Sequence, residues 1–155
     1  EALEMFKRQV QDYLSATYVV PSFELYVFDW QQNIFLSPEQ PEKSVIKPEH
    51  AVVLFAEHNK RTFCTERSMT EAHGLSDMQL AELMIFMQRN NFICLVPLYT
   101  EQAIYGFVFF TLEQIKDSKL FALKSFDVLQ PFSRQFGSLL QKILIYDAIV
   151  LQRPK

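Results

Sequence analysis

The sequence predicts an α+β fold in which one central antiparallel sheet is covered by helices on both faces. Strand-like segments come in consecutive pairs, whereas helix-like segments form separate groups at the two ends and in the middle of the chain. The two longest strand-like segments are apolar on both faces, which is typical of strands that lie between two helical layers. We expect the terminal helices to cover one face of the sheet and the middle helices to cover the other.

The first part of the chain is expected to form one helix followed by two strands. Apolar side chains recur at helical spacing and predict an amphipathic helix over residues 2–15. Residues 22–30 and 33–37 are rich in β-branched and aromatic side chains, and they predict two strands. Gln31 and Gln32 would then form the turn of a hairpin.

The next part is expected to contain a loop, a short helix and a brief strand. Residues 38–50 carry three prolines and mixed charge, so they predict a surface loop. Pro48 is well placed to open the following helix, which we expect over residues 51–59. Residues 61–66 predict a brief strand.

Two more helices are expected. Ser76 is suited to cap a helix over residues 77–89, with Gln79 as its capping-box partner. Residues 118–152 are expected to be largely helical, with Pro131 as an internal interruption or kink.

The hairpin between these helices carries most of the fold prediction. Residues 92–96 and 104–110 do not alternate between apolar and polar side chains, so both faces of these strands must be covered. They are expected in the middle of the sheet. Pro97 has no amide hydrogen and is expected at a strand end or a bulge.

Composition supports one domain over residues 1–155 and excludes several classes of function. Hydrophobic residues make up 49% of the chain and 15 residues are Phe, which is enough for a core. The net charge is -3 and the charges are scattered, which disfavours nucleic-acid binding. No apolar run is long enough for a membrane span.

The start of the chain and its cysteines suggest a cytoplasmic fragment. The chain begins with Glu1 rather than Met, so we expect a piece of a longer protein. Cys64 and Cys94 are too few for a disulfide framework or a zinc site, and reduced thiols fit a cytoplasmic location.

The segment LVPLYTEQAIYGFVFFTL, residues 95–112, resembles the signature hairpin of GAF domains. It has an apolar strand ending in Val-Pro-Leu, a polar turn, and a Gly-containing apolar strand. The closing segment FDVLQPFSRQFGSLLQKILIYDAIVL is also similar to the segment that comes after this hairpin in the family. The resemblance implies a cavity that the middle helices and loops cover, and a sensory or regulatory role within a larger signalling protein. A PAS domain is the alternative fold.

The resemblance implies a ligand pocket, but the sequence leaves the ligand and any cofactor unknown. The candidate pocket residues are Phe28, Trp30, Phe55, Cys64, Met84, Cys94, Val96, Tyr105 and Phe107. A register error of one residue would move half of them to the other face. NKRTFCTE, residues 59–66, offers Asn-Lys and Phe as in cyclic-nucleotide-binding members, but its single acid and compressed spacing indicate chance similarity.

Catalytic motifs are absent from the sequence. We find no HExxH, no phosphate-binding glycine loop and no Gly-x-Ser-x-Gly elbow, so we expect no enzyme and no metal site. A small-molecule enzyme that uses Cys64 or Cys94 stays as the least favoured alternative.

The terminal helices are expected to pair two copies of the chain. In the last helix, apolar residues step by four and three alternately, which is the spacing of a coiled-coil seam. The expected homodimer interface comprises Phe6, Val10, Phe136, Leu139, Ile143, Tyr146 and Val150. The alternative is a single wide stripe that the sheet and the first helix use completely.

These expectations together describe a non-catalytic sensory module. A small molecule in the pocket would bias the packing of the last helix, which would pass the change to a C-terminal effector domain. The alternative from a different class is a dimerisation scaffold whose pocket is filled by its own Phe and Met side chains.

Overall fold

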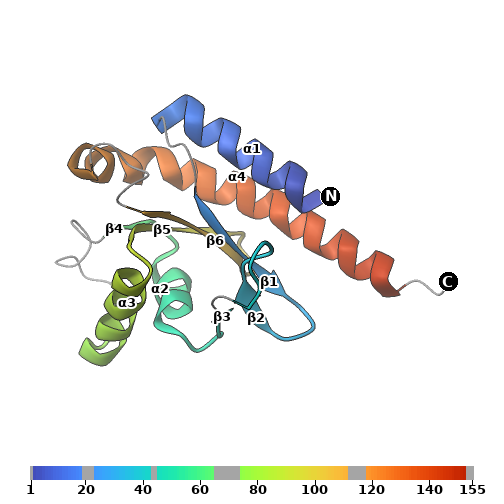
Figure 1. The fold of residues 1–155 in the computed structure, drawn as a ribbon, viewed down its shortest axis with the longest axis horizontal. Coiled ribbons are helices and arrows are strands. Elements are labelled where there is room, and N and C mark those ends of the chain that lie inside the picture. Colours follow the sequence, from blue (N-terminus) through green and yellow to red (C-terminus); the bar gives the residue numbers. More distant parts are fainter. Residues whose placement is uncertain (1, 19–22, 43–44, 65–73, 112–117, 153–155) are drawn as a thin grey trace.

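The computed structural model describes residues 2–18, 23–42, 45–64, 74–111 and 118–152 (Figure 1). Side chains are described in these ranges except at residues 17–18, 64, 118–129 and 148–152. The elements are α1 (Ala2–Tyr18), β1 (Glu24–Asp29), β2 (Ile34–Leu36), β3 (Val45–Ile46), α2 (Ala51–Asn59), β4 (Phe63–Cys64), α3 (Asp77–Arg89), β5 (Phe92–Tyr99), β6 (Ile104–Thr111) and α4 (Ser118–Gln152).

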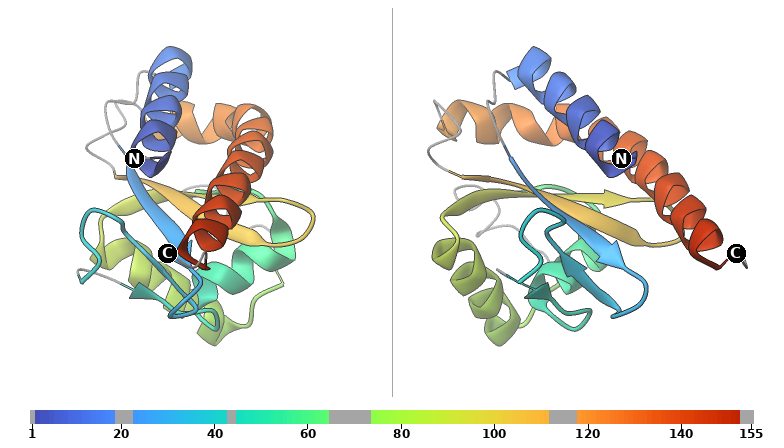
Figure 2. Two further views of the ribbon diagram at one scale, coloured as in Figure 1. Left: turned by 90° about the vertical axis from the view of Figure 1, so that its right-hand side faces the viewer. Right: turned by 45° about the vertical axis from the view of Figure 1, so that its right-hand side comes forward.

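The strands form one antiparallel sheet between two helical layers, which confirms the predicted α+β class. The strand order is β3-β2-β1-β6-β5-β4, and every strand pair is antiparallel. Figures 1 and 2 show α1 and α4 side by side on one face of the sheet, and α2 and α3 on the other. The long hairpin of β5 and β6 lies within the sheet, as predicted.

The hairpin is shielded from water on both faces. All residues of β6 except Thr111 are buried, and all residues of β5 except Ile93 are buried. Alternate side chains enter two separate cores. Val96 and Val108 lie in the core beneath α1 and α4, whereas Leu95 and Phe107 lie in the core beneath α2 and α3.

Pro97 is inside β5 rather than at its end, one residue before the irregularity in pairing between Leu98 and Tyr99. It stands opposite Phe107 of β6. On the other side of β5, the short strand β4 pairs only with Cys94 and Leu95. Because β4 ends before it reaches Pro97, a proline is tolerated here without losing a bond to β4.

The helix boundaries in the middle of the chain follow from their caps. α2 begins at Ala51, as expected. Its N-cap is His50, whereas we expected Pro48 to open the helix. α3 has the predicted capping box, in which the backbone N–H of Gln79 donates to Ser76 Oγ over 3.1 Å and Gln79 Oε1 accepts from the Ser76 N–H over 2.9 Å. Both hydrogen-bonding groups of this cap are neutral.

Two local predictions in the first half need correction. The strand β3 lies within residues 38–50, which we expected to form only a loop; it adds two residues to the edge of the sheet beside β2. The first hairpin turn is wider than the predicted pair of glutamines, because Asn33 has a φ of 56° and its N–H donates to Asp29 O over 2.9 Å.

Two glycines allow α4 to pack closely on the sheet: Gly137 of α4 lies against strand backbone, and Gly106 of β6 lies against the side chain of Leu140. A Cβ at Gly137 would come within 2.3 Å of the carbonyl oxygen of Tyr99 in β5. A Cβ at Gly106 of β6 would come within 2.6 Å of Tyr26 O and 2.9 Å of a methyl group of Leu140 in α4. Both positions therefore require glycine for packing. The helix runs unbroken through Pro131, and Figure 2 shows its axis changing direction in this first part.

Candidate functional site

A cleft of about 490 Å³ opens at the rim of the core beneath α2. It lies where the first hairpin, helix α2 and the β5–β6 turn meet. Its lining residues are Phe28, Trp30, Asn33, Phe35, Pro48, Val53, Glu57, Lys60, Gln102, Ala103, Ile104 and Tyr105. The volume lies within the range of small-molecule sites.

One wall of the cleft is aromatic. The rings of Phe28 and Trp30 meet edge to face, with centroids 5.3 Å apart. Phe28 also packs against Phe35 at 5.2 Å, and Phe35 continues the contact to Phe107 in the core at 5.0 Å. Trp30 is 53% exposed. An exposed indole in this aromatic wall provides a stacking surface for a planar or cationic group.

The opposite wall carries one carboxylate and one ammonium group. Glu57 and Lys60 come from the last turn of α2 and its C-cap. Lys60 has a φ of 49°, in the left-handed region that usually favours glycine at this position. Its N–H donates to Ala56 O over 2.8 Å, and its carbonyl accepts from Gln130 Nε2 over 2.9 Å. A single side chain, that of Gln130, therefore connects α4 to a residue that lines the cleft.

A second groove of about 390 Å³ adjoins the cleft, since Lys60 and Gln102 line both. Its far side is formed by the α4 residues Arg134, Ser138 and Gln141. The Gln141 amide donates to the hydroxyl of Tyr105, which borders the cleft, over 2.8 Å. Polar contacts thus connect the cleft to α4 at two places.

Tyr99 makes further polar contacts with α4, one of them to the same Gln130. Its hydroxyl is hydrogen-bonded to the side-chain amide of Gln130 and, over 3.5 Å, to Nε of Arg134. This hydrogen bond is the main influence that raises the pKa of Arg134 above its ordinary value, so the guanidinium group stays charged. Tyr99 itself is only 3% exposed.

Three of the predicted pocket residues line the cleft, namely Phe28, Trp30 and Tyr105. Phe55 and Phe107 are instead completely buried in the core between the sheet and α2. Met84 is half-buried and packs against the same core. The space that we expected to be a cavity is therefore filled by aromatic side chains, and the open volume lies at its rim.

Three of the predicted pocket residues belong to the core on the opposite face of the sheet, and one of them, Tyr105, also borders the cleft. Cys94 and Val96 are fully buried in the core beneath α1 and α4. This corrects their assignment to the pocket, and the cause is the period of two along a strand, which the sequence could not anchor to a face. The backbone of Cys64 pairs with β5 opposite Cys94, but the Cys64 side chain lies outside the described residues.

The sequence interpretation missed the polar residues of the cleft. Glu57, Lys60 and Gln102 all line it, and none was among the candidates. A usable signal was present: Gln102 lies in the polar break between the two apolar strands, and turn residues at strand ends often border binding sites.

Most of the predicted dimer residues are already buried within one chain. Phe6, Val10 and Phe136 are at most 4% exposed, and they form one core with Leu140 and Leu144. In this part of the last helix, the predicted seam residue Phe136 therefore belongs to the same buried face as Leu140 and Leu144. This corrects the assignment of the three residues to an interface between copies.

The other predicted dimer residues are more accessible. Leu139 and Ile143 are only partly buried, and Tyr146 is 65% exposed. The Val150 side chain lies outside the described residues. Whether two copies pair stays a prediction.

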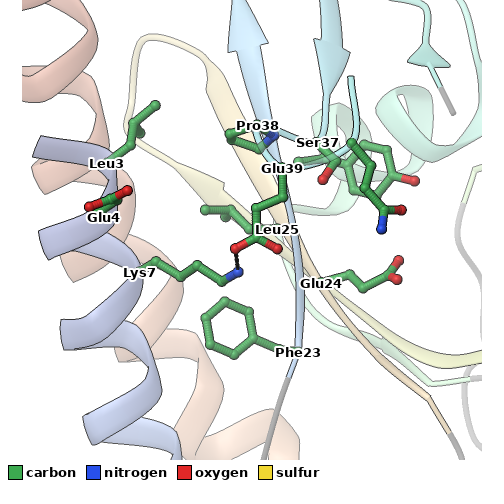
Figure 3. A pocket seen from close by; sticks show the side chains of 11 residues that line it. Leu3, Glu4, Lys7, Phe23, Glu24, Leu25, Ser37, Pro38 and Glu39 are labelled. Carbon is green, nitrogen blue, oxygen red and sulfur yellow. Dashed lines mark hydrogen bonds and ion pairs between the residues drawn. The ribbon is translucent and has the colours of Figure 1, made fainter. Parts of the chain in front are cut away.

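A smaller hollow of about 110 Å³ lies between α1 and the start of β1 (Figure 3). Lys7 of α1 and Glu39 of the loop after β2 form an ion pair across it. Because the hollow is small and spanned by this contact, it offers less room for a ligand than the aromatic cleft. In the described part of the chain, no three metal-binding side chains gather in one place.

Two solved structures are similar to this chain over most of its length. A GAF domain of a phosphoenolpyruvate-protein phosphotransferase from Acinetobacter is similar to this chain with a TM-score of 0.47 and 14% identity, covering 91% of each chain. A second such domain, from Coxiella burnetii, has a TM-score of 0.45 and 14% identity, covering 95% of this chain and 96% of its own.

At these TM-scores and identities, the likeness assigns neither a family nor a role to this chain. No protein-family model and no curated protein sequence matches the chain. Among the described residues, no helix is long and apolar enough to cross a membrane. Its function therefore has to be argued from its own residues.

Proposed function

We propose that this GAF-like domain is a non-catalytic regulatory module that binds a small molecule in the aromatic cleft and relays binding through α4. The observation that carries the proposal is the hydrogen bonding of the cleft to α4 from two sides. Gln130 binds the Lys60 carbonyl, and Gln141 binds the Tyr105 hydroxyl. A ligand that shifts Lys60 or Tyr105 would change the contacts of α4, and such differential contacts are what a population shift requires.

The rest of the proposed arrangement extends the module beyond this chain. The domain would work in the cytoplasm as part of a larger signalling protein, with an effector region connected to α4. Two copies would pair through the end of α4, where Tyr146 and Ile145 are 65% and 43% exposed. Large apolar side chains exposed in this way often mark a contact surface.

A blocked cleft tests ligand binding. Native mass spectrometry of the purified chain would detect a co-purified small molecule, and Ala103→Phe should abolish its retention because Ala103 is exposed on the cleft wall. Ala16→Phe, on the exposed side of α1, is the matched control and should retain it. Retention by the Ala103→Phe variant would contradict the assignment of the site.

A scaffold that binds no ligand is the second candidate function, and one observation favours it. Phe55, Phe63, Phe107 and Phe109 are all 0% exposed, so aromatic side chains fill the interior beneath α2 and α3. If the purified chain carries no small molecule and still sediments as a dimer, this alternative is preferred. Tyr146→Glu should then dissociate the dimer, whereas Met78→Glu, at an 85% exposed position of α3, should not.

A further inference from the structure

The first turn of α2 depends on one imidazole and one carboxylate for two of its hydrogen bonds. The amide of Val52 donates to His50 Nδ1 over 3.0 Å, and the amide of Ala51 donates to Glu82 Oε1 over 2.6 Å. The next two amides, of Val53 and Leu54, donate to the His50 carbonyl over 3.0 and 3.1 Å. All four amides at the start of α2 are therefore satisfied, two of them by side chains that can titrate.

This arrangement requires a neutral His50. An imidazole nitrogen accepts a hydrogen bond only when it carries no proton, so the ring must hold its proton on Nε2. Protonation of Nδ1 would place two donors opposite each other at the Val52 amide. The ring would therefore turn away, and the Val52 amide would lose its hydrogen bond to His50.

The surroundings give the ring room to turn and a partner to meet. His50 lines an open hollow of about 520 Å³ together with Glu82, Phe86 and Arg89 of α3. Its ring packs edge-on against Phe86 with centroids 5.2 Å apart. The charged groups that face His50 are Glu82 and Arg89 from α3 and Glu49 from the preceding turn. In the same turn, the backbone N–H of His50 donates to the carbonyl of Lys47 over 3.0 Å.

We propose that His50 and Glu82 form a pH-sensitive latch, in which protonation of His50 transfers Glu82 from the Ala51 amide to the imidazolium ring and releases the first turn of α2 from α3. In the closed state the proton is on Nε2 alone, and the two side chains each accept one amide. In the open state the second proton, taken from solvent, is on Nδ1, and the imidazolium pairs with the carboxylate. The Ala51 and Val52 amides then have only water as a partner.

Burial of the ring favours the closed state at neutral pH. Burial lowers the pKa of His50 below its ordinary value, and the carboxylates of Glu82 and Glu49 partly oppose this effect. As the pH falls, the unfolded or open ring therefore takes up a proton before the closed ring does. The latch is therefore closed at and above the ordinary histidine pKa, and it opens as the pH falls below that value, through the lowered pKa of His50.

The consequence of opening reaches the rest of the chain through α2. Helix α2 carries Val53, Glu57 and the cap residue Lys60, which line the aromatic cleft. The latch itself needs no ligand, so it can be tested whether or not the cleft binds one.

Amide hydrogen exchange of the intact chain, followed by NMR from about pH 8 to about pH 5, tests the latch. After correction for intrinsic rates, the protection of Ala51 and Val52 should fall about fivefold or more, which corresponds to the loss of a cap. The internal control is the Gln79 amide of α3, which is held by the Ser76 hydroxyl and should not lose protection. Equal changes at the two helices would overturn the proposal.

Two variants keep the test decisive. Asparagine is a good N-cap that does not titrate, so His50→Asn should keep the protection high and remove its pH dependence. His58→Gln, which removes another histidine from α2 at an exposed position, should leave the transition unchanged. A transition that persists in His50→Asn, or an NMR signature of a proton on Nδ1 at neutral pH in the unmodified chain, would contradict the latch.

Discussion

The two faces of the sheet use similar apolar residues but are closed in different ways. On the face of α1 and α4, the long helix touches strand backbone directly at Gly137 and packs on Gly106 through the side chain of Leu140, and nothing larger than glycine fits at either position. On the face of α2 and α3, phenylalanines fill the interior, and the helices are held by caps and leave an open cleft at the rim. The comparison teaches that α4 meets strand backbone directly at Gly137, whereas the rim of the α2 face keeps an open cleft, and that α4 is connected to both.

The largest effect is expected in the aromatic core beneath α2 and α3. Phe109 is completely buried and stacks on Phe92 with ring centroids 4.5 Å apart. Phe109→Ala should lower the free energy of unfolding by about 4 kcal/mol, because the cavity cannot collapse between rigid strands. Chemical denaturation measures this change. Met78→Ala, at an 85% exposed position of α3, is the control and should change it by less than about 0.5 kcal/mol.

The close contact of α4 is tested by adding one methyl group. Gly137→Ala should lower the free energy of unfolding by about 3 kcal/mol, because the Cβ would overlap the backbone of Tyr99. The sign is informative, since alanine normally stabilises a helix interior relative to glycine by about 1 kcal/mol. An unchanged or raised stability in urea would show that α4 is free to move away from β5, and the contrast between the two faces would fail.

The connection between the two faces is expected to be weaker than either core. Gln130→Leu removes the hydrogen bonds to the Lys60 carbonyl and the Tyr99 hydroxyl, and should cost about 2 kcal/mol because the two partners are left part-buried. Gln135→Leu, at an exposed position of the same helix, is the matched control and should be nearly neutral. The same denaturation midpoint for both variants would argue against a connection through Gln130.

The smallest effect concerns the strained residue at the cleft. Lys60→Gly should raise the free energy of unfolding by about 1 kcal/mol, because glycine adopts the left-handed conformation without steric cost. If Lys60 serves a ligand, the same variant should retain less of any co-purified molecule. A variant that is less stable than the parent chain would indicate that the Lys60 side chain supports the fold itself.

Protonation of His50 is expected to add a pH dependence to the stability of the face of α2 and α3. Because the pKa of folded His50 is lowered, its contribution to stability is complete above the ordinary histidine value and declines as the pH falls through it. Thermal unfolding should therefore show a loss of stability on acidification in the parent chain that is smaller in His50→Asn. Other titrating groups contribute equally to both proteins, so the difference isolates this residue.

The fold could be predicted from local patterns that have one structural solution. Ser76 and Gln79 marked the start of α3 because a capping box satisfies two helix amides at once. The apolar residues on both faces of 92–96 and 104–110 required two covering layers, and this was confirmed. The bounds of α2 were also predicted, although its capping residue was not.

The candidate site was much less predictable. Cys94 and Val96 were assigned to the wrong face because a strand pattern that is apolar on both sides contains no information about which core each residue enters. Phe55 and Phe107 were expected to line an open pocket and instead fill it. Of the polar cleft residues, Glu57 was not singled out, because charged residues at a helix end are usually only solvated. Lys60 was considered only as part of the Asn-Lys pair in residues 59–66, which was interpreted as chance similarity.

The sequence by itself determined the elements, the antiparallel hairpin and its burial between two layers, because periodicity and capping act over a few neighbouring residues. Only the tertiary structure decided which side chains fill the interior, where open volume remains, and that His50 and Glu82 meet at the start of α2. These features depend on contacts between residues that are distant in the chain, and their geometry is set by packing that no local pattern encodes.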